Sequence, residues 1–379
     1  MKIMKLFFLI IISFLFNISN SFALNSIATH AIIFDYETNE ILYEKNAFEK
    51  TPPASTTKIL TSYIVFDQIK KGNLQLDDKF RVSEKAYKKG GSSMFLETNT
   101  MVTVKDLLYG IIVQSGNDAS IVVAENISGS ERAFTDLMNE YAIKIGMKKS
   151  NFVNSSGWPH PLHYTTMYDL SVLSKAIIRD FPEMYKIFSE KEFTYNNITQ
   201  PNRNSLLDLY EGTDGLKTGY VKDSGYGIVI STLKNGRRII IAINGLESRK
   251  SRVIESERLL NWAYRNTTLQ KIFKKGQVVK KTDVWLGNKN QVDLIVGQDI
   301  LTTLKADQKN SIEAKIIYDR PIEAPIIKNQ EIGKIIIEIK DKEPLEYPLY
   351  AKDSVKKINP VFRIFSAIRY LIFGNINND

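Results

Sequence analysis

The order of strand-like and helix-like segments constrains the fold of this chain most. Strand patterns occur at 31–44 and again at 225–244, and each stretch contains a tight polar turn. Between them, residues 104–190 show mainly helical patterns, interrupted by the Gly/Pro-rich segment Ser156–Pro161. Strands at both ends of a helical middle predict one antiparallel sheet assembled from distant parts of the chain and covered by helices. We therefore expect an α/β (α+β) domain, closed by a helix at about 252–265.

A second domain is expected after this one. From about Leu269, short alternating segments such as 312–316 and 334–339 are separated by Gly, Pro, Asn and Asp. This pattern is typical of a small all-β domain. The 379 residues leave room for both domains. We place the first domain at 24–267 and the β-rich C-terminal domain at 268–352.

The N-terminal residues predict a secretory signal peptide over 1–23. Two early lysines precede an apolar run at 6–16, and a small-residue cleavage site ends at Ala23. The alternative is a retained membrane anchor, but the apolar run is shorter than the roughly 20 residues that span a bilayer. We expect the mature protein to begin near Leu24 and to work outside the cytoplasm.

The C-terminal residues 353–379 predict an amphipathic helix that lies in a membrane surface. A helical arrangement gathers the apolar side chains on one face, and Lys356 and Lys357 lie just upstream, where they can meet lipid headgroups. The alternative is a helix docked on its own protein. The apolar face consists of Val361, Ile364, Phe365, Ile368, Leu371 and Ile372.

Charge and composition narrow the partners and the chemistry. The formal charge of +9 suits anionic lipid surfaces or wall polymers, and export argues against nucleic acid as a partner. The chain has no cysteine, which excludes disulfides, thiolate nucleophiles and cysteine metal sites. Its three histidines, His30, His160 and His163, leave few bases for a Ser-His-Asp triad.

The stretch PPASTTKIL contains a hydroxyl and an amine three residues apart, at Ser55 and Lys58. On a helix these side chains share one face. A serine hydroxyl needs a base to become a nucleophile, and lysine serves only if burial or a second cation keeps it neutral. Two further Ser-x-x-Lys matches, which begin at Ser231 and Ser354, show that the pattern alone is not decisive.

Two other motifs supply the missing parts. Ser115-Gly116-Asn117 is the only Ser-x-Asn in the chain, and Lys217-Thr218-Gly219 is the only Lys-Thr-Gly. Lys217 is a candidate second cation for Lys58, and Ser115 is a candidate proton relay. The order Ser-x-x-Lys, Ser-x-Asn, Lys-Thr-Gly is typical of class A β-lactamases and penicillin-binding proteins.

With these motifs the chain resembles the low-molecular-mass penicillin-binding proteins, which are serine-type D-alanyl-D-alanine carboxypeptidases. The likeness runs from about Asn25 to the C-terminus, and Gly116 matches the Ser-Gly-Asn variant of the family. The resemblance implies a β-lactamase/transpeptidase-like catalytic domain, a β-rich domain and the amphipathic tail. Further matching segments are GGSSMFLE, IIVQSGNDAS, QPNRNSLLD, DGLKTGY and APIIKNQEIGKI.

The resemblance also implies a role for each catalytic residue. Ser55 would be the acylated nucleophile and Lys58 its general base. Ser115 and Lys217 would form the proton relay and the electrostatic partner, and Asn117 would hold the substrate amide.

The implied substrate-binding residues lie near the third motif. Thr218 would bind the terminal carboxylate, and Gly219 belongs to the same strand. The backbone N–H groups of Ser55 and Tyr220 would form the oxyanion hole. Arg203 and Arg252 would stand on the carboxylate side, where arginine suits a free carboxylate by charge and geometry.

The expected reaction removes the terminal D-alanine from peptidoglycan stem pentapeptides through an acyl-enzyme on Ser55. β-Lactam antibiotics would acylate the same residue, and the reaction requires no metal or organic cofactor. The resemblance implies an exported protein held peripherally, through its tail, on the periplasmic face of the inner membrane.

Three alternatives remain open at the level of the sequence. A β-lactamase of this fold needs a deacylating glutamate, and no Glu-x-x-Leu-Asn segment occurs between Asn117 and Lys217. A D,D-endopeptidase would use the same core residues. A non-catalytic wall-binding module would need no nucleophile and base together. For His163, which precedes an expected Thr-capped helix, we favour a structural role over a catalytic one.

Overall fold

The computed structural model describes residues 24–359 together with 364 and 368. The expected signal peptide lies outside these residues, as does most of the expected tail helix. The chain divides into two compact units. The first holds the described residues up to Ile33 with Tyr43–Ile230 and Ile241–Leu259. The second holds Phe34–Leu42, Ser231–Ile240 and the chain from Leu260 onward.

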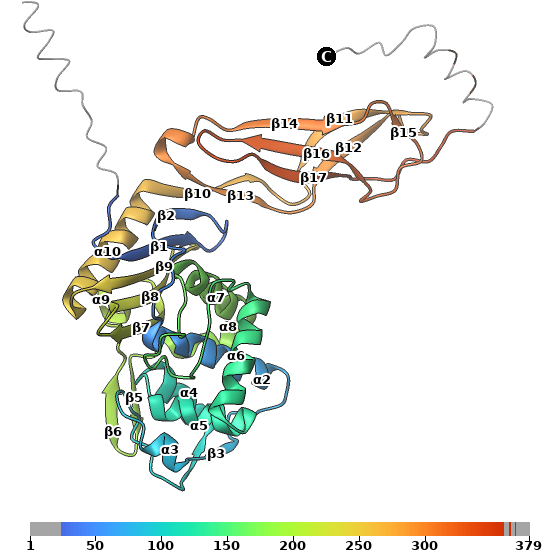
Figure 1. The fold of residues 1–379 in the computed structure, drawn as a ribbon. Coiled ribbons are helices and arrows are strands. Elements are labelled where there is room, and N and C mark those ends of the chain that lie inside the picture. Colours follow the sequence, from blue (N-terminus) through green and yellow to red (C-terminus); the bar gives the residue numbers. More distant parts are fainter. Residues whose placement is uncertain (1–23, 360–363, 365–367, 369–379) are drawn as a thin grey trace, which may run out of the picture. The chain divides into compact units, whose positions relative to one another are not determined.

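Strands from both ends of the first 246 residues form a five-stranded sheet (Figure 1). The turn between its two longest strands contains Asn235 and Gly236 at φ 52° and 74°. Two successive positive φ values are the requirement of a tight hairpin turn, which Asn-Gly satisfies at low cost. The expected assembly of one sheet from distant segments is confirmed. The order is β2 (Ile41–Lys45), β1 (His30–Asp35), β9 (Arg237–Leu246), β8 (Gly225–Lys234) and β7 (Thr213–Val221).

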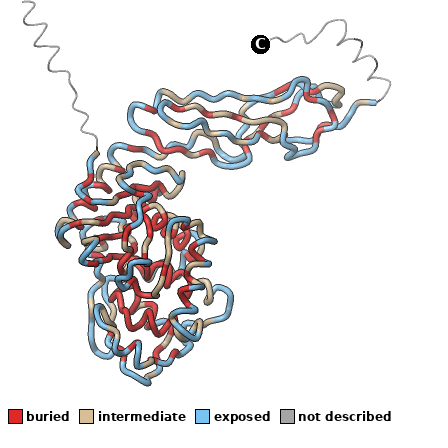
Figure 2. The backbone as a smooth tube through the Cα atoms, viewed as in Figure 1, coloured by how far each residue is buried: buried red, intermediate tan, exposed pale blue. Residues whose placement is uncertain are grey.

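Helix α2 (Lys58–Lys70) is the centre of the helical cluster. Its first nine residues, Lys58 to Phe66, are all buried, because α2 packs against α4, α5, α6 and α7. Figure 2 shows the buried residues concentrated within this cluster and along the sheet. The surrounding helices are α4 (Val104–Ile112), α5 (Asn117–Ser128), α6 (Glu131–Ile145) and α7 (Met167–Asp180).

Shorter elements and one long helix complete this part of the chain. The helix expected at 252–265 begins three residues earlier, at Arg249. None of the helices within 24–359 is long and apolar enough to cross a bilayer. The elements are α3 (Glu84–Tyr87), α8 (Pro182–Tyr185), α9 (Leu206–Leu209), α10 (Arg249–Asn266), η2 (Lys186–Ser189), β3 (Lys79–Arg81), β4 (Met101–Thr103), β5 (Glu192–Tyr195) and β6 (Ile198–Pro201).

Side-chain caps determine where several helices begin. The hydroxyls of Thr103, Ser130 and Thr166 accept hydrogen bonds from backbone N–H groups three residues later. Each bond satisfies an N–H group that has no partner inside the helix. Thr166 thereby confirms the expected Thr-capped helix after His163.

The C-terminal residues form the expected all-β structure, with a core of Val, Ile and Leu side chains such as Leu294, Ile335 and Leu349. A two-stranded sheet of β10 (Thr267–Phe273) and β13 (Ile300–Lys305) precedes a six-stranded sheet. Its order is β14 (Glu313–Tyr318), β16 (Glu331–Glu338), β17 (Leu345–Ala351), β12 (Gln291–Val296), β11 (Val278–Trp285) and β15 (Ile322–Glu323).

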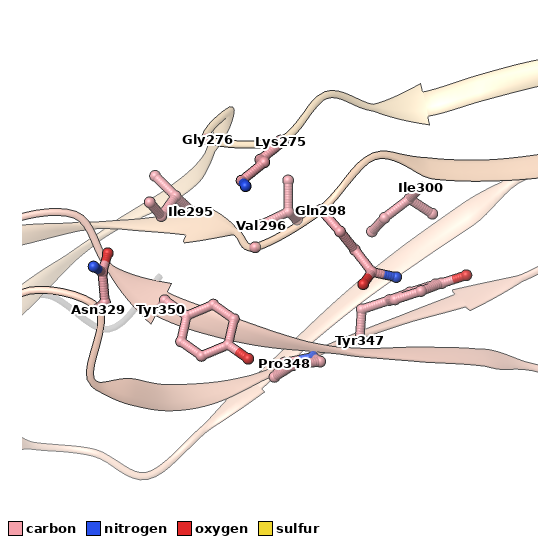
Figure 3. Close-up of a pocket in the computed structure, with 11 residues that line it drawn as sticks. Lys275, Gly276, Ile295, Val296, Gln298, Ile300, Asn329, Tyr347, Pro348 and Tyr350 are labelled. Atoms are coloured by element: carbon pink, nitrogen blue, oxygen red, sulfur yellow. The ribbon is translucent and has the colours of Figure 1, made fainter. Parts of the chain in front are cut away.

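A pocket of about 350 Å³ opens in this β-rich part (Figure 3). Tyr347, Pro348 and Tyr350 line one side of it, and Ile295 and Val296 line the other. None of the site residues expected from the sequence lines this pocket.

A buried ion pair joins distant segments of the second unit. Asp35 is fully buried and accepts hydrogen bonds from Arg237 Nε at 2.8 Å and from Thr303 Oγ1 at 2.9 Å. Arg237 also donates to the carbonyl and the hydroxyl of Thr267. Every charge at this junction therefore has a partner, as burial requires.

We predict that Arg237→Met lowers the free energy of unfolding by about 3–5 kcal/mol, because it leaves the Asp35 carboxylate buried without a cation. Urea-induced unfolding measures the change. Lys315→Met, which removes an ion pair with Glu338 on the exposed surface, should leave the transition where it is. Equal shifts in both variants would contradict the assigned importance of burial.

Candidate active site

Ser55 and Lys58 lie where a 3₁₀ turn continues into an α-helix. Ser55 lies in the 3₁₀ turn η1 (Ala54–Thr57), and Lys58 is the first residue of α2. In a 3₁₀ turn residues i and i+3 stand above one another, so Lys58 Nζ lies 3.1 Å from Ser55 Oγ. The sequence reasoning assumed an ordinary α-helix here. Ala54 takes φ +50°, an unusual conformation for alanine, directly before the serine.

The Lys58 amine is completely buried and reaches three oxygens. Besides Ser55 Oγ, it lies 2.8 Å from Asn117 Oδ1 and 2.6 Å from the carbonyl of Ser156. Burial lowers the pKa of Lys58 well below its ordinary value, and the positive charge of Lys217 lowers it further. This environment favours the neutral form of the amine.

The turn Ser115–Asn117 lies beside Lys58 and carries the second motif. Ser115 is buried and takes φ +64°, and Gly116 is the N-cap of α5, so that Asn117 opens the helix. The Asn117 amide accepts from Lys58 and donates to the carbonyl of Gly90 at 2.9 Å. Ser115 is not among the three hydrogen-bond partners of Lys58. A side chain at Gly116 would lie 2.8 Å from a carboxylate oxygen of Asp118, so the middle position favours glycine.

Strand β7 supplies the third motif. Lys217 and Thr218 are buried. Burial, with Arg203 and Arg252 nearby, lowers the pKa of Lys217 to about 7. Gly219 lets the strand lie against η1: a Cβ at this position would stand 3.1 Å from the Pro53 carbonyl.

Two arginines lie beside Lys217, with different degrees of burial. Arg252 is 7% exposed, and its buried Nε has no hydrogen-bond partner among the residues that the structure describes. Its guanidinium lies 3.4 Å from the Arg203 carbonyl through Nη2. Arg203 is exposed and contacts Gln200. A buried cation with an unused donor is suited to an anionic ligand.

Tyr220 follows Gly219 on β7. Its side chain is 53% exposed and stacks on Tyr226 with ring centroids 4.3 Å apart. The side chain therefore points out of the buried cluster, as expected for a residue implicated only through its N–H group.

The sequence reasoning missed the segment that completes the environment of Lys58. The Ser156 carbonyl accepts from Lys58, and Asn154 holds this loop by accepting from the backbone N–H groups of Gly157 and Trp158. Gly157 takes φ +84°, and a Cβ there would collide with the Ala54 carbonyl at 1.7 Å. The Gly/Pro-rich interruption at 156–161 was the available signal, although a backbone acceptor has no side-chain signature.

His163 contacts the residue next to Lys58. Its Nδ1 accepts from the backbone N–H of Val153 at 3.2 Å, which leaves the proton on Nε2, 2.8 Å from Thr57 Oγ1. The side chain is 2% exposed, and burial lowers its pKa to about 4. The ring is thus neutral and links the 3₁₀ turn to the loop that carries Ser156.

The three motifs lie in the same compact unit. Two models of known protein families match successive parts of the chain. The model of the D-alanyl-D-alanine carboxypeptidase peptidase family matches residues 19–247, and that of the penicillin-binding protein 5 C-terminal domain matches residues 268–357. The chain belongs to the D-alanyl-D-alanine carboxypeptidase family. It is accordingly a serine-type D-alanyl-D-alanine carboxypeptidase.

Individual relatives cover most of the chain. D-alanyl-D-alanine carboxypeptidase DacD of Escherichia coli is 37% identical over 90% of this chain and 93% of its own length. The crystal structure of penicillin-binding protein 5 from Haemophilus influenzae superposes with a TM-score of 0.80, at 35% identity over 88% of this chain and 99% of its own. Penicillin-binding protein D2 of Listeria monocytogenes, solved in an ampicillin-bound form, matches 64% of this carboxypeptidase and 99% of its own chain at 28% identity, with a TM-score of 0.59.

We predict that His163 makes the stability of this carboxypeptidase fall on acidification. The unfolded chain protonates its histidine near pH 6.5 and the folded protein only near pH 4, so the unfolded state binds more protons between these values and stability is lost as pH falls. From about pH 7 to about pH 5 the loss should reach about 2 kcal/mol. Denaturant unfolding at each pH measures it.

His163→Gln should flatten this dependence, since glutamine does not titrate. The exposed His160 serves as the control. Its charge is a smaller cause than burial of the lowered pKa of His163, so His160→Gln should keep most of the wild-type dependence. An unchanged slope in His163→Gln would show that other groups cause the acid sensitivity.

Proposed function

We propose that this carboxypeptidase removes the terminal D-alanine of peptidoglycan stem pentapeptides, with Ser55 as the nucleophile and Lys58 as its base. The observation that carries the proposal is the fully buried Lys58 amine 3.1 Å from Ser55 Oγ. Burial disfavours the charged form of this amine and so favours the neutral form that a lysine general base requires.

The contacts of Lys58 favour one orientation of its lone pair. A neutral amine has two N–H donors and one lone pair. The two shortest contacts go to carbonyl-type oxygens, Asn117 Oδ1 at 2.8 Å and the Ser156 carbonyl at 2.6 Å, and these oxygens can only accept. Both N–H groups are used there, so the lone pair is left for the hydroxyl proton of Ser55.

Acylation then follows the ordinary course of serine acyl transfer. The proton of the Ser55 hydroxyl moves to Lys58 while the oxygen forms a bond to the carbonyl carbon between the two D-alanines. The backbone N–H groups of Ser55 and Tyr220 would hold the resulting oxyanion. Loss of one donor in such an arrangement typically costs about 2.7–4 kcal/mol of barrier.

The leaving D-alanine needs a proton on its nitrogen when the carbon–nitrogen bond breaks. We assign delivery to Ser115, as relay from Lys58, with Lys217 as the electrostatic partner. The pKa of Lys217 is about 7, so near neutral pH this amine is protonated in only part of the molecules. A bound anionic substrate would increase the protonated fraction. Asn117, fixed between Lys58 and Gly90, would hold the amide on the acyl side of the scissile bond.

A free carboxylate on the leaving residue distinguishes a carboxypeptidase substrate. We assign the binding of this carboxylate to Thr218 on β7 and Arg252 on α10. Gly219 allows β7 to lie close to η1, and the exposed Arg203 would add a further positive charge. The unpartnered Nε of the buried Arg252 supports this assignment. A cation cluster of Lys217, Arg252 and Arg203 also suits the free carboxylate of a carboxypeptidase substrate better than the internal bond of an endopeptidase substrate.

Water completes the cycle by attacking the Ser55 ester, which releases the shortened peptide and restores the hydroxyl. β-Lactams would acylate Ser55 by the same attack and leave slowly. The absence of a Glu-x-x-Leu-Asn segment between Asn117 and Lys217 argues against fast β-lactam hydrolysis. A D,D-endopeptidase and a non-catalytic wall-binding module remain as outcomes of the tests below.

We also propose where the protein acts. Residues 1–23 would direct export, and residues 353–379 would attach the protein to the periplasmic face of the inner membrane as an amphipathic helix. The β-rich segment 268–352 would hold the catalytic domain, 24–267, away from the membrane. Family membership, with a cell-wall role, supports export in general.

The function is tested with Ser55→Ala, because this change removes the only proposed nucleophile. We predict loss of covalent labelling by a fluorescent penicillin and at least a thousandfold loss, in order of magnitude, of D-alanine release from a synthetic pentapeptide. Ser354→Ala alters another Ser-x-x-Lys match outside the site and should change neither.

Other results of the penicillin-labelling and pentapeptide experiments would favour one of the alternative functions. Labelling without D-alanine release, but with cleavage of cross-linked peptides, would select the endopeptidase. Penicillin turnover of many molecules per second would select the β-lactamase. No Ser55-dependent adduct at all would leave a wall-binding module.

Membrane attachment is tested by deleting residues 353–379 from the full chain. We predict that the shortened protein moves from the membrane to the soluble fraction and still hydrolyses soluble pentapeptide, because the proposed site lies far upstream in the sequence. A shortened protein that stays with the membrane would refute the anchor.

A further inference from the structure

A further cation, Lys89, precedes Gly90, whose carbonyl accepts from the Asn117 amide. Lys89, in the turn after α3, is half-buried, and its Nζ lies 3.9 Å above the ring of Trp158. It is close enough to the catalytic amine that its charge contributes to the lowered pKa of Lys58. Lys89 thus belongs electrostatically to the site, although no motif includes it.

No carboxylate among the described residues forms an ion pair with Lys89. The carboxylate that influences it most, Glu131, already pairs with Lys85 at 2.7 Å and accepts two hydrogen bonds from Ser155. Burial lowers the pKa of the Lys89 amine. Its contact with the Trp158 ring offsets part of the desolvation, and an anionic ligand could offset more.

The surroundings of Lys89 are fixed rather than loose. Gly91 packs between Asn117 and Trp158: a Cβ on it would lie 2.7 Å from Asn117 Nδ2 and 3.2 Å from the Trp158 ring. The backbone of Trp158 is held by Asn154, which accepts from its N–H and donates to its carbonyl, both at 2.9 Å. The Trp158 ring is still 43% exposed and forms an apolar surface at the edge of the site.

We propose that Lys89 and Trp158 form an anion subsite for the acyl side of the substrate. The subsite takes a free carboxylate carried by the residue that precedes the D-alanyl-D-alanine, while the Trp158 ring packs against the aliphatic part of that side chain. This inference rests on the proposed function, because Asn117 marks the acyl side only if it holds the acyl amide.

Charge and position together favour a carboxylate as the ligand. The leaving end of the substrate meets Lys217, Arg252 and Arg203, so a substrate with carboxylates at both ends would match cations at both ends of the site. An amine on the acyl side would instead meet Lys89 and be repelled. An uncharged side chain on the substrate would contact the Trp158 ring but would form no ion pair with Lys89.

The test compares two peptides that differ in one group. Both end in D-alanyl-D-alanine, and the preceding side chain carries either a free carboxylate or the corresponding carboxamide. The wild type should cleave the carboxylate peptide with a kcat/KM about fivefold higher, since an ion pair at a partly exposed site contributes modestly. High salt should reduce this preference, because it screens the pair.

Lys89→Gln should abolish the preference, and Lys89→Arg should retain it. Any effect of Lys89 on the pKa of Lys58 acts on both peptides alike, so the ratio of their two kcat/KM values reports the subsite. Lys88→Gln is the matched control: Lys88 is the neighbouring residue, exposed and paired with Glu84, so the preference should persist. A preference that survives Lys89→Gln, or disappears equally in Lys88→Gln, would overturn the subsite.

A second readout separates this inference from the proposed reaction. Two penicillins with a carboxylate or a carboxamide in the acyl side chain report the same subsite through the rate of Ser55 acylation. If the wild type releases no D-alanine, the proposed function fails, but a Lys89-dependent difference between the penicillins would still support the subsite. The subsite would be refuted if the ratio of the two acylation rates, carboxylate penicillin to carboxamide penicillin, were the same in wild type and Lys89→Gln.

Discussion

The proposed chemistry of this protein depends on keeping the Lys58 amine out of water. Lys58 begins a helix whose first nine residues are buried, and its amine is enclosed by the Asn117 side chain and the Ser156 carbonyl. In water the amine would be protonated and would have no lone pair for a serine. The helical cluster around α2 therefore does more than stabilise the fold, because it creates the environment in which Lys58 can act as a base.

A second constraint follows from the charges around this amine. Burial lowers the pKa of both Lys58 and Lys217. The charge of Lys217 lowers that of Lys58 further, and Arg203 and Arg252 do the same for Lys217. Like charges held together without anions cost free energy in the empty protein. In the proposed complex, a substrate carboxylate beside Arg252 would relieve this repulsion and would be oriented by it.

Much of the fold and most of the site were predictable from sequence patterns. The hairpin turn at Asn235-Gly236, the buried helix after Lys58 and the β-rich C-terminal part all follow from local periodicity and turn residues. The Ser156 carbonyl was not predictable, because any residue type supplies a backbone oxygen. The 3₁₀ turn at Ser55 was missed as well, since its formation depends on Gly157 and Gly219 packing against it from distant parts of the chain.

The sequence by itself determined which reactive groups the protein has: a serine and a lysine three residues apart, a Ser-Gly-Asn, a Lys-Thr-Gly, and no cysteine. Those groups are fixed by the order of residues and need no fold to be recognised. Only the tertiary structure decided their protonation and their partners, and it also placed Lys89 against the Trp158 ring. Burial and the distances between charges set the pKa of a side chain, and both arise only when segments far apart in the chain are packed together.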